Sequence, residues 1–270
     1  MRRQSNPTRP GHYQRRDRKG VVAFVLILLA SPLLAQPPAG AGRGGRGGRG
    51  GPPPTPKAAA PIDLTGYWVS VVTEDWRYRM VTPPKGAFGG VPLNAEGRRV
   101  ANAWDPAKDE AEGQQCRSYG AAALMRVPGR LHITWENETT LRIDTDAGTQ
   151  TRLFHFVNRI QGDFTANWQG FSTAEWEFAG GRGPSHNGDL KVVTTLLRPG
   201  YLRKNGVPYS ANTVLTEYYD MIPAPNGDTW LVVTTEVRDP QYLTMPFITS
   251  THFKKLPDAA GWDPQPCTAK

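Results

Sequence analysis

Residues 131–136 read Leu-His-Ile-Thr-Trp-Glu, a strict alternation of apolar and polar side chains. A turn follows, and residues 141–145, Leu-Arg-Ile-Asp-Thr, alternate in the same way. Successive side chains of a strand point to opposite faces of a sheet, so this pattern indicates two half-buried β-strands joined by a turn.

Seven further segments are rich in β-branched and aromatic residues, which favour strands; they span 64–72, 151–157, 173–178, 190–197, 214–222, 230–237 and 247–254. Turn-forming dipeptides lie between them, Pro-Gly at 199–200 and Asn-Gly at 187–188, 205–206 and 226–227. Nine short strands separated by turns predict a single all-β domain, an antiparallel meander that closes into a barrel or folds into a sandwich. One short helix is expected over 93–105, with Asn94 as its N-cap.

The net charge of the 270-residue chain is +8, which raises the question of nucleic-acid binding. Residues 62–270 carry 21 Lys and Arg against 23 Asp and Glu, so the excess positive charge belongs to the N-terminal region. This distribution argues against a basic nucleic-acid-binding domain. We therefore expect no nucleic-acid partner.

The N-terminal region divides into two segments that precede the domain at 62–270. Residues 1–35 place a basic stretch before a short apolar run from Val21 to Leu34, and Ala35 then offers a small residue for cleavage. This order is typical of a cleaved secretory signal peptide. A membrane anchor is the alternative, but the apolar run is shorter than the roughly 18 residues that a span needs. Residues 36–61 are rich in Pro, Gly and Arg and predict a disordered linker. Its Arg-Gly-Gly repeats could contact anionic envelope polymers, and a periplasmic or secreted location is expected.

The chain has two cysteines, Cys116 and Cys267. In an oxidising compartment they are expected to form a disulfide that closes a loop of about 150 residues. Neither has a His or a second Cys at metal-ligand spacing, which argues against a metal site.

Eight tryptophans are candidates for core packing or for an aromatic pocket. We expect Trp168 and Trp176 to line the pocket, because they bracket a glycine-containing segment beside paired acids. Glu175 and Glu177 flank Trp176 and share one face of the strand. Two neighbouring carboxylates resemble the acid–base pair of a glycosidase. A solvated or ion-paired strand face is the more common arrangement. Glu217 and Glu236 could form ion pairs across the sheet with Arg142, Arg152 or Arg238.

Four histidines follow the signal peptide. His132, His155 and His252 lie in predicted strands, and His186 lies in a glycine-rich loop. Zinc binding would need the three strand histidines to converge, but their spacing gives no support for it, so no metal and no cofactor is expected. His155 could serve as an acid or base, since the free imidazole titrates near neutral pH. Nucleophile-elbow, phosphate-loop and dinucleotide-binding motifs are not found in the sequence.

The order of motifs resembles an uncharacterised family of exported β-rich proteins from environmental bacteria. The matching segments include 63–68 (Asp-Leu-Thr-Gly-Tyr-Trp), 92–97, 104–106, 127–131, 168–172, 175–177, 190–195, 206–210, 216–218, 239–242 and 246–247. The sequence departs from the family at 173–174 and in the glycine-rich stretch 180–188. The resemblance covers nearly all of 62–267 and implies an exported, lipocalin-like β-barrel of about eight or nine strands, but no reaction.

Together these patterns predict a barrel that binds a small, largely apolar molecule in its interior. Its ligand-binding residues are expected to be Trp168, Trp176, Arg152, His155, Glu177 and Tyr218. The alternative is an enzyme, a hydrolase, lyase or isomerase that uses His155 or Glu177 as general acid or base. A third hypothesis is an envelope interaction module that binds through an exposed apolar patch.

Overall fold

The computed structural model describes residues 52–157, 163–178 and 188–270. The predicted signal peptide, most of the predicted linker and His186 lie outside these residues. Asn187, the first residue of one predicted Asn-Gly turn, also lies outside them.

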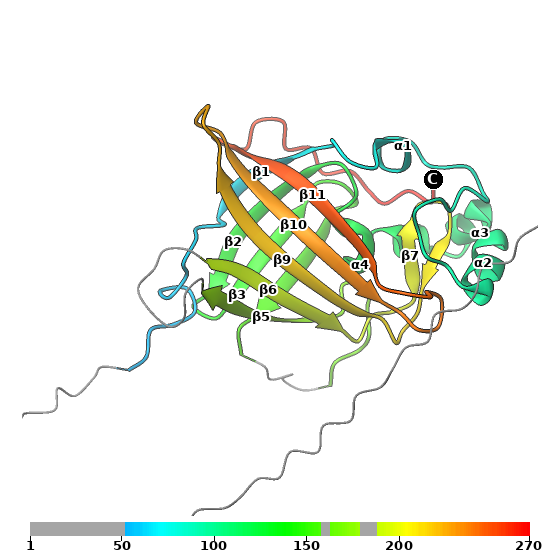
Figure 1. Ribbon diagram of the computed structural model, residues 1–270, viewed down its shortest axis with the longest axis horizontal. Coiled ribbons are helices and arrows are strands. Elements are labelled where there is room, and N and C mark those ends of the chain that lie inside the picture. Colours follow the sequence, from blue (N-terminus) through cyan, green and yellow to red (C-terminus); the bar gives the residue numbers. More distant parts are fainter. Residues whose placement is uncertain (1–51, 158–162, 179–187) are drawn as a thin grey trace, which may run out of the picture. The chain divides into compact units, whose positions relative to one another are not determined.

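Nine of the described strands form a closed barrel (Figure 1), in the order β1-β11-β10-β9-β6-β5-β4-β3-β2. Their bounds are β1 Gly66–Val71, β2 Arg130–Asn137, β3 Thr140–Thr145, β4 Gln150–His155, β5 Phe171–Phe178, β6 Gly188–Thr195, β9 Val214–Pro223, β10 Thr229–Arg238 and β11 Phe247–Leu256. Each of the nine predicted segments overlaps one of these strands. The prediction of a β-barrel is therefore confirmed.

The expectation of a purely antiparallel barrel was wrong at one place. β4 and β5 pair in parallel, through Phe154 with Ser172 and His155 with Thr173. A closed ring with an odd number of strands cannot alternate in direction all the way round, so at least one neighbouring pair must be parallel. The connection over 156–170 is long enough for the crossover that a parallel pair requires.

The described residues also form four short α-helices and one 3₁₀ helix, where the sequence predicted one helix. They are α1 Trp76–Arg79, α2 Ala95–Asn102, α3 Pro106–Ala111, η1 Gln115–Ser118 and α4 Ala121–Leu124. α2 is the predicted helix, and Asn94 caps it by accepting a hydrogen bond from the Gly97 amide at 2.8 Å. The other segments have four to six residues, too few to show a helical period in the sequence. Within the described ranges, we find no helix with the length and apolar character needed to cross a bilayer.

A small hairpin lies outside the barrel sheet, formed by β7 Gly200–Arg203 and β8 Val207–Tyr209. The predicted Asn-Gly turn at 205–206 joins its strands. Gly206 has a φ of +81°, and a Cβ there would lie 2.2 Å from Cβ of Trp104, so only glycine fits. The helices and this hairpin lie toward one end of the barrel (Figure 1).

Side chains fill the middle of the barrel. Ten inward-pointing residues have no exposed surface, namely Trp68, Ile133, Ile143, Phe154, Leu190, Val192, Tyr219, Leu231, Val233 and Phe253. The interior of a small barrel is either packed with side chains or holds one ligand. In this barrel the ten residues pack the interior. The interior therefore does not match the expected ligand-filled bore, and a binding site has to be sought at the ends.

Candidate functional site

The six residues that the sequence suggested for ligand binding do not converge on one pocket. Arg152 and Trp176 point toward the barrel interior, whereas His155, Glu177 and Tyr218 alternate with buried neighbours and lie on the outer face. Trp168 lies before β5, half-buried, where its indole N–H donates to the Pro199 carbonyl at 3.3 Å and Arg198 stacks on its ring.

Arg152 is fully buried and forms a paired charge inside the barrel. Its two terminal nitrogens donate to the two carboxylate oxygens of Glu217 at 2.9 and 2.6 Å, and also to the hydroxyls of Tyr219 and Thr194. Burial alone would lower the pKa of Arg152, but the charge and hydrogen bonds of Glu217 raise it above the ordinary value. Arg152 and Glu217 thus form a bidentate ion pair, which is typical of a structural role.

His155 and Glu177 are not partners. His155 stacks on Phe171 with ring centroids 5.0 Å apart, and burial lowers its pKa. His155 pairs with Thr173 across the sheet, so Glu177 lies four residues farther along β5, about 13 Å at strand spacing. Glu177 and Glu175 instead both form ion pairs with Lys191, at 3.2 and 2.9 Å, as expected for a solvated face. This arrangement does not provide the His–Glu pair that an acid–base enzyme would need.

Trp176 packs at the barrel end opposite the helices. Its ring lies 5.2 Å from that of Phe156 and 6.5 Å from that of Trp135, and its N–H donates to the Pro56 carbonyl at 2.8 Å. Lys57 forms an ion pair with Glu138 nearby. Contacts to the barrel thus begin within the described part of the segment that the sequence assigned to the linker.

The three strand histidines contact different groups of residues. His132 stacks on Tyr67 at 4.0 Å, while Nδ1 of His252 lies 3.0 Å from the Thr73 hydroxyl and 3.3 Å from the Glu74 carboxylate. In the described ranges, we find no group of three or more His, Cys, Asp or Glu side chains arranged to hold a metal ion.

A cavity of about 470 Å³ lies at the helical end of the barrel, and we call it the end pocket. It is lined by residues from five regions of the chain, within 78–82, 118–130, 146–148, 202–204 and 263–268. Its apolar surface includes Met80, Val81, Val127 and Pro266, and its aromatic rings are Tyr78 and Tyr119. The volume is within the range of sites for small molecules.

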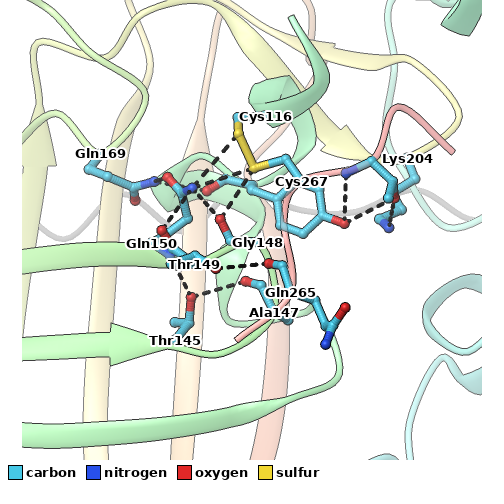
Figure 2. The surroundings of a disulfide bond; sticks show 12 residues. Cys116, Thr145, Ala147, Gly148, Thr149, Gln150, Gln169, Lys204, Gln265 and Cys267 are labelled. Carbon is cyan, nitrogen blue, oxygen red and sulfur yellow. Dashed lines mark hydrogen bonds between the residues drawn. A yellow bond between two sulfur atoms is a disulfide. The ribbon is translucent and has the colours of Figure 1, made fainter. Parts of the chain in front are cut away.

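Figure 2 shows the disulfide between Cys116 and Cys267. It holds one wall of the end pocket in place, because Pro266 and Thr268, the neighbours of Cys267, line the pocket. The C-terminal tail is also fixed by its backbone: the Gln265 amide donates to the Asp146 carbonyl at 2.8 Å, and the Thr149 hydroxyl donates to the Gln265 carbonyl at 2.9 Å. The predicted disulfide is thus present and joins the tail to η1. The two hydrogen bonds join the tail to the turn between β3 and β4.

That turn depends on Gly148. Its φ is +78°, and a Cβ at this position would lie 2.2 Å from the ring of Tyr119. The absence of a side chain lets Tyr119 pack against the turn and line the pocket beside the tail.

Charged residues around the end pocket are mostly basic. Five cations line it against two carboxylates, Asp146 and Asp263; the cations are Arg79, Arg126, Arg130, Arg203 and Lys204. Arg79, Arg126 and Arg203, which we call the arginine cluster, have exposed fractions of 8%, 5% and 4%. A small anionic or polar group entering the pocket would meet a positive potential.

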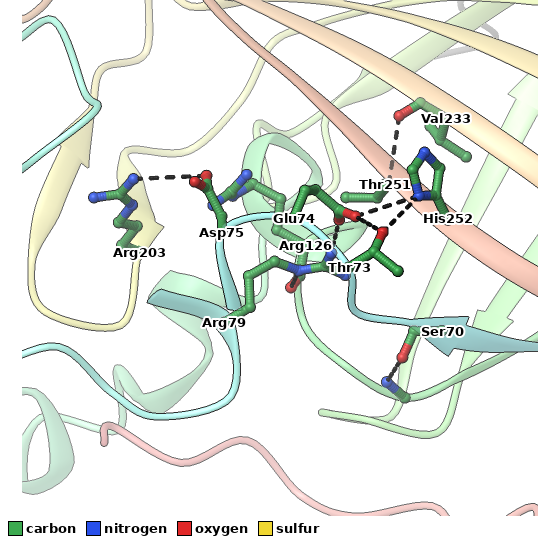
Figure 3. A network of polar contacts seen from close by, with 11 residues as sticks. Ser70, Thr73, Glu74, Asp75, Arg79, Arg126, Arg203, Val233, Thr251 and His252 are labelled. Carbon is green, nitrogen blue, oxygen red and sulfur yellow. Dashed lines mark hydrogen bonds and ion pairs between the residues drawn. The ribbon is translucent and has the colours of Figure 1, made fainter. Parts of the chain in front are cut away.

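Glu74 and Asp75 face the arginine cluster (Figure 3). Arg126 donates to Asp75 at 3.0 Å, Arg203 lies 3.9 Å from the same carboxylate, and Arg79 pairs with Glu74. Asp75 adopts a left-handed backbone with φ of 50°, which an aspartate tolerates better than most residues. This conformation places its carboxylate between two guanidinium groups.

The cluster remains cationic at neutral pH. Burial, followed by repulsion from Arg126, lowers the pKa of Arg79 to about 10. The same two causes lower the pKa of Arg203 to about 10, against the opposing attraction of Asp75. Burial also lowers the pKa of Arg126, although Asp75 opposes the change.

The arginine cluster was not predicted from the sequence. One feature of the sequence pointed to it: Arg126 directly follows the apolar run that begins at Ala121. A charged side chain buried beside such a run needs a charged or hydrogen-bonding partner. Arg79 and Arg203 lie in ordinary polar surroundings in the sequence, and only the fold brings the three together.

Comparison of the chain with protein-family models, with curated proteins and with solved structures found no match. The function is therefore argued from the geometry of the site.

Proposed function

We propose that this chain is an exported binding protein for a small, largely apolar molecule, and that the molecule occupies the end pocket. The observation that carries this proposal is the cavity of about 470 Å³, which combines apolar and aromatic walls with a few converging polar groups. Desolvation of the apolar part would supply most of the affinity, and the polar groups would orient the molecule.

The proposed ligand site lies at the end of the barrel, whereas the sequence predicted a site in the bore. A lipocalin-like barrel implies a ligand among the inward-facing side chains, but here those side chains pack against one another. The end pocket has walls from separate segments, and the disulfide fixes one of them. The same disulfide is compatible with export to the periplasm or the medium, as the predicted signal peptide suggests.

The test is a titration of the full chain, purified from an exporting host, with N-phenyl-naphthylamine, an uncharged amine that fluoresces in apolar surroundings. Saturable binding is expected for the natural sequence. Thr82→Trp should fill the pocket from a half-buried lining position and weaken binding at least about tenfold. The control is Ile222→Trp, which adds the same ring at an exposed position in β9.

Two results would overturn the proposal: no saturable binding by the natural chain, or equal losses in Thr82→Trp and the control. Native mass spectrometry of protein from its own host would complement the titration. A co-purified small molecule should be retained by the natural chain and by Ile222→Trp, and lost from Thr82→Trp.

A further inference from the structure

The arginine cluster combines deep burial with an unusual number of free donors. The side chains of Arg79, Arg126 and Arg203 have exposed fractions of only 1%, 6% and 2%, and all three residues line the end pocket. They come from the end of α1, the residues after α4 and the end of β7. The fold thus gathers three guanidinium groups at one wall of a cavity.

Several of their N–H groups have hydrogen-bond partners. Arg79 Nε donates to the Arg126 carbonyl at 2.9 Å, Arg126 Nη2 donates to Asp75 at 3.0 Å, and Arg203 Nη1 donates to the Gly89 carbonyl at 2.6 Å. Arg203 also stacks over the ring of Tyr78 at 4.1 Å. These contacts hold each side chain in one orientation.

Other donors of the same side chains are buried without a hydrogen-bond partner. They are Nη2 of Arg79, Nη1 of Arg126, and Nε and Nη2 of Arg203. An unpaired buried donor costs free energy, and one on a charged group costs more. Three arginines beside one cavity therefore leave four donor nitrogens unmatched by the protein.

The charges around the cluster are also unmatched. Three cations face two carboxylates, Glu74 and Asp75, and Glu74 is shared with His252. The single carboxylate of Asp75 is the negative partner of both Arg126 and Arg203. One further negative group near these two arginines would balance the cluster.

We infer that the molecule bound in the end pocket is an organic acid, with an apolar body and a carboxylate or similar oxyanion that the arginine cluster receives. This inference rests on the proposed function and adds the chemical class of the ligand. Guanidinium groups match the planar geometry of oxyanions and form strong charge-assisted hydrogen bonds with them. Because the three side chains are more than nine-tenths buried, the site suits a small molecule rather than a polymer.

The test compares two probes with the same ring system. Anilinonaphthalene sulfonate carries a sulfonate on the skeleton of N-phenyl-naphthylamine, so the ratio of their affinities reports the contribution of the negative group. The natural chain should bind the sulfonate at least about tenfold more tightly. Arg126→Gln should reduce this ratio about tenfold, and Arg203→Gln provides a second variant if the first does not fold.

The matched control is Arg98→Gln, which removes an exposed arginine of α2. This variant should leave the affinity ratio as it is in the natural chain. An equal fall of the ratio in Arg98→Gln and Arg126→Gln would mean that the sulfonate senses surface charge in general, which would overturn the inference.

Asp75→Asn tests the same inference in the opposite direction. Asp75 competes for the donors of Arg126 and Arg203, so a neutral side chain of the same shape should tighten sulfonate binding severalfold. Asparagine also tolerates the left-handed backbone at this position. No gain in this variant, together with an unchanged ratio in Arg126→Gln, would contradict the inference.

The outcomes separate the two proposals. If neither probe binds saturably, the end pocket is not a binding site and the proposed function fails. If both probes bind equally well and Thr82→Trp weakens both, the pocket binds apolar molecules and only the inference of an acidic ligand fails.

Discussion

Arg152 in the barrel and the arginine cluster at its end are all more than nine-tenths buried, but their surroundings differ. Both terminal nitrogens of Arg152 contact Glu217, and only its Nε lacks a partner. In the cluster, three arginines share Glu74 and Asp75, and four nitrogens have no hydrogen-bond partner. The difference supports the proposal that the arginine cluster receives a ligand, whereas Arg152 stabilises the fold.

The position of each group explains this difference. Glu217 lies in the sealed interior with no exposed side-chain surface, so its pair with Arg152 has no access to water. The side chain of Asp75 is 40% exposed, and the arginines beside it line a cavity. A charge that lines a cavity can be balanced by a molecule that enters from outside.

The largest expected change in unfolding free energy comes from removing the disulfide that holds the wall of the end pocket. Cys116→Ser combined with Cys267→Ser opens a loop of 151 residues and should cost about 5 kcal/mol of unfolding free energy in the chain-entropy account. Urea denaturation followed by circular dichroism would measure it. Because residues 263–268 line the end pocket, N-phenyl-naphthylamine binding should also weaken in conditions where the barrel remains folded. An unchanged affinity would show that the tail is not part of the site.

The next largest change in stability is expected from breaking the ion pair between Arg152 and Glu217 in the interior. Glu217→Gln leaves Arg152 charged and uncompensated, and should lower the free energy of unfolding by about 3–5 kcal/mol. Asp75→Asn is the matched change at the pocket end and should cost only about 1 kcal/mol, since its carboxylate is partly exposed. The double variant Arg152→Met with Glu217→Leu should recover most of the loss. Similar costs for Glu217→Gln and Asp75→Asn would remove the contrast between the two regions.

The smallest effect concerns the outer face of the barrel. Burial lowers the pKa of His155 in the folded protein below its value of about 6.5 in the unfolded chain. The unfolded state then binds more protons, so stability should fall as the pH drops below about 6.5. His155→Gln should remove that part of the slope in pH-dependent urea denaturation. A carboxylate partner such as Glu177 would instead raise the pKa of His155, so a slope of opposite sign would favour the enzyme alternative.

Much of the barrel could be predicted from local patterns. Alternation of the kind at 131–136 depends only on the two-residue repeat of a strand, and all nine predicted strands are present. Asn94 as a cap depends on its own side chain and the next three residues. The parallel contact of β4 with β5 was missed, although it follows from closing a ring with nine strands.

The candidate site was harder to predict, because a single sequence does not reveal which strand face points inward. His155, Glu177 and Tyr218 were grouped with Arg152 by chemical type, but they lie on the other face of their strands. Among the ion pairs proposed across the sheet, Arg152 with Glu217 is present. Glu236 pairs with Arg238, but both lie on β10, so this pair does not cross the sheet. The short helices were missed because α1 and α4 have only four residues each.

The amino-acid sequence by itself determined the strands, the turns between them and the cysteines available for a disulfide, because these depend on neighbours along the chain. Only the tertiary structure decided that the bore is filled and that Arg79, Arg126 and Arg203 meet beside a cavity. Their positions in the sequence are separated by dozens of residues, and no local pattern encodes their approach. The packing of α1, α4 and β7 at one end of the barrel brings them together.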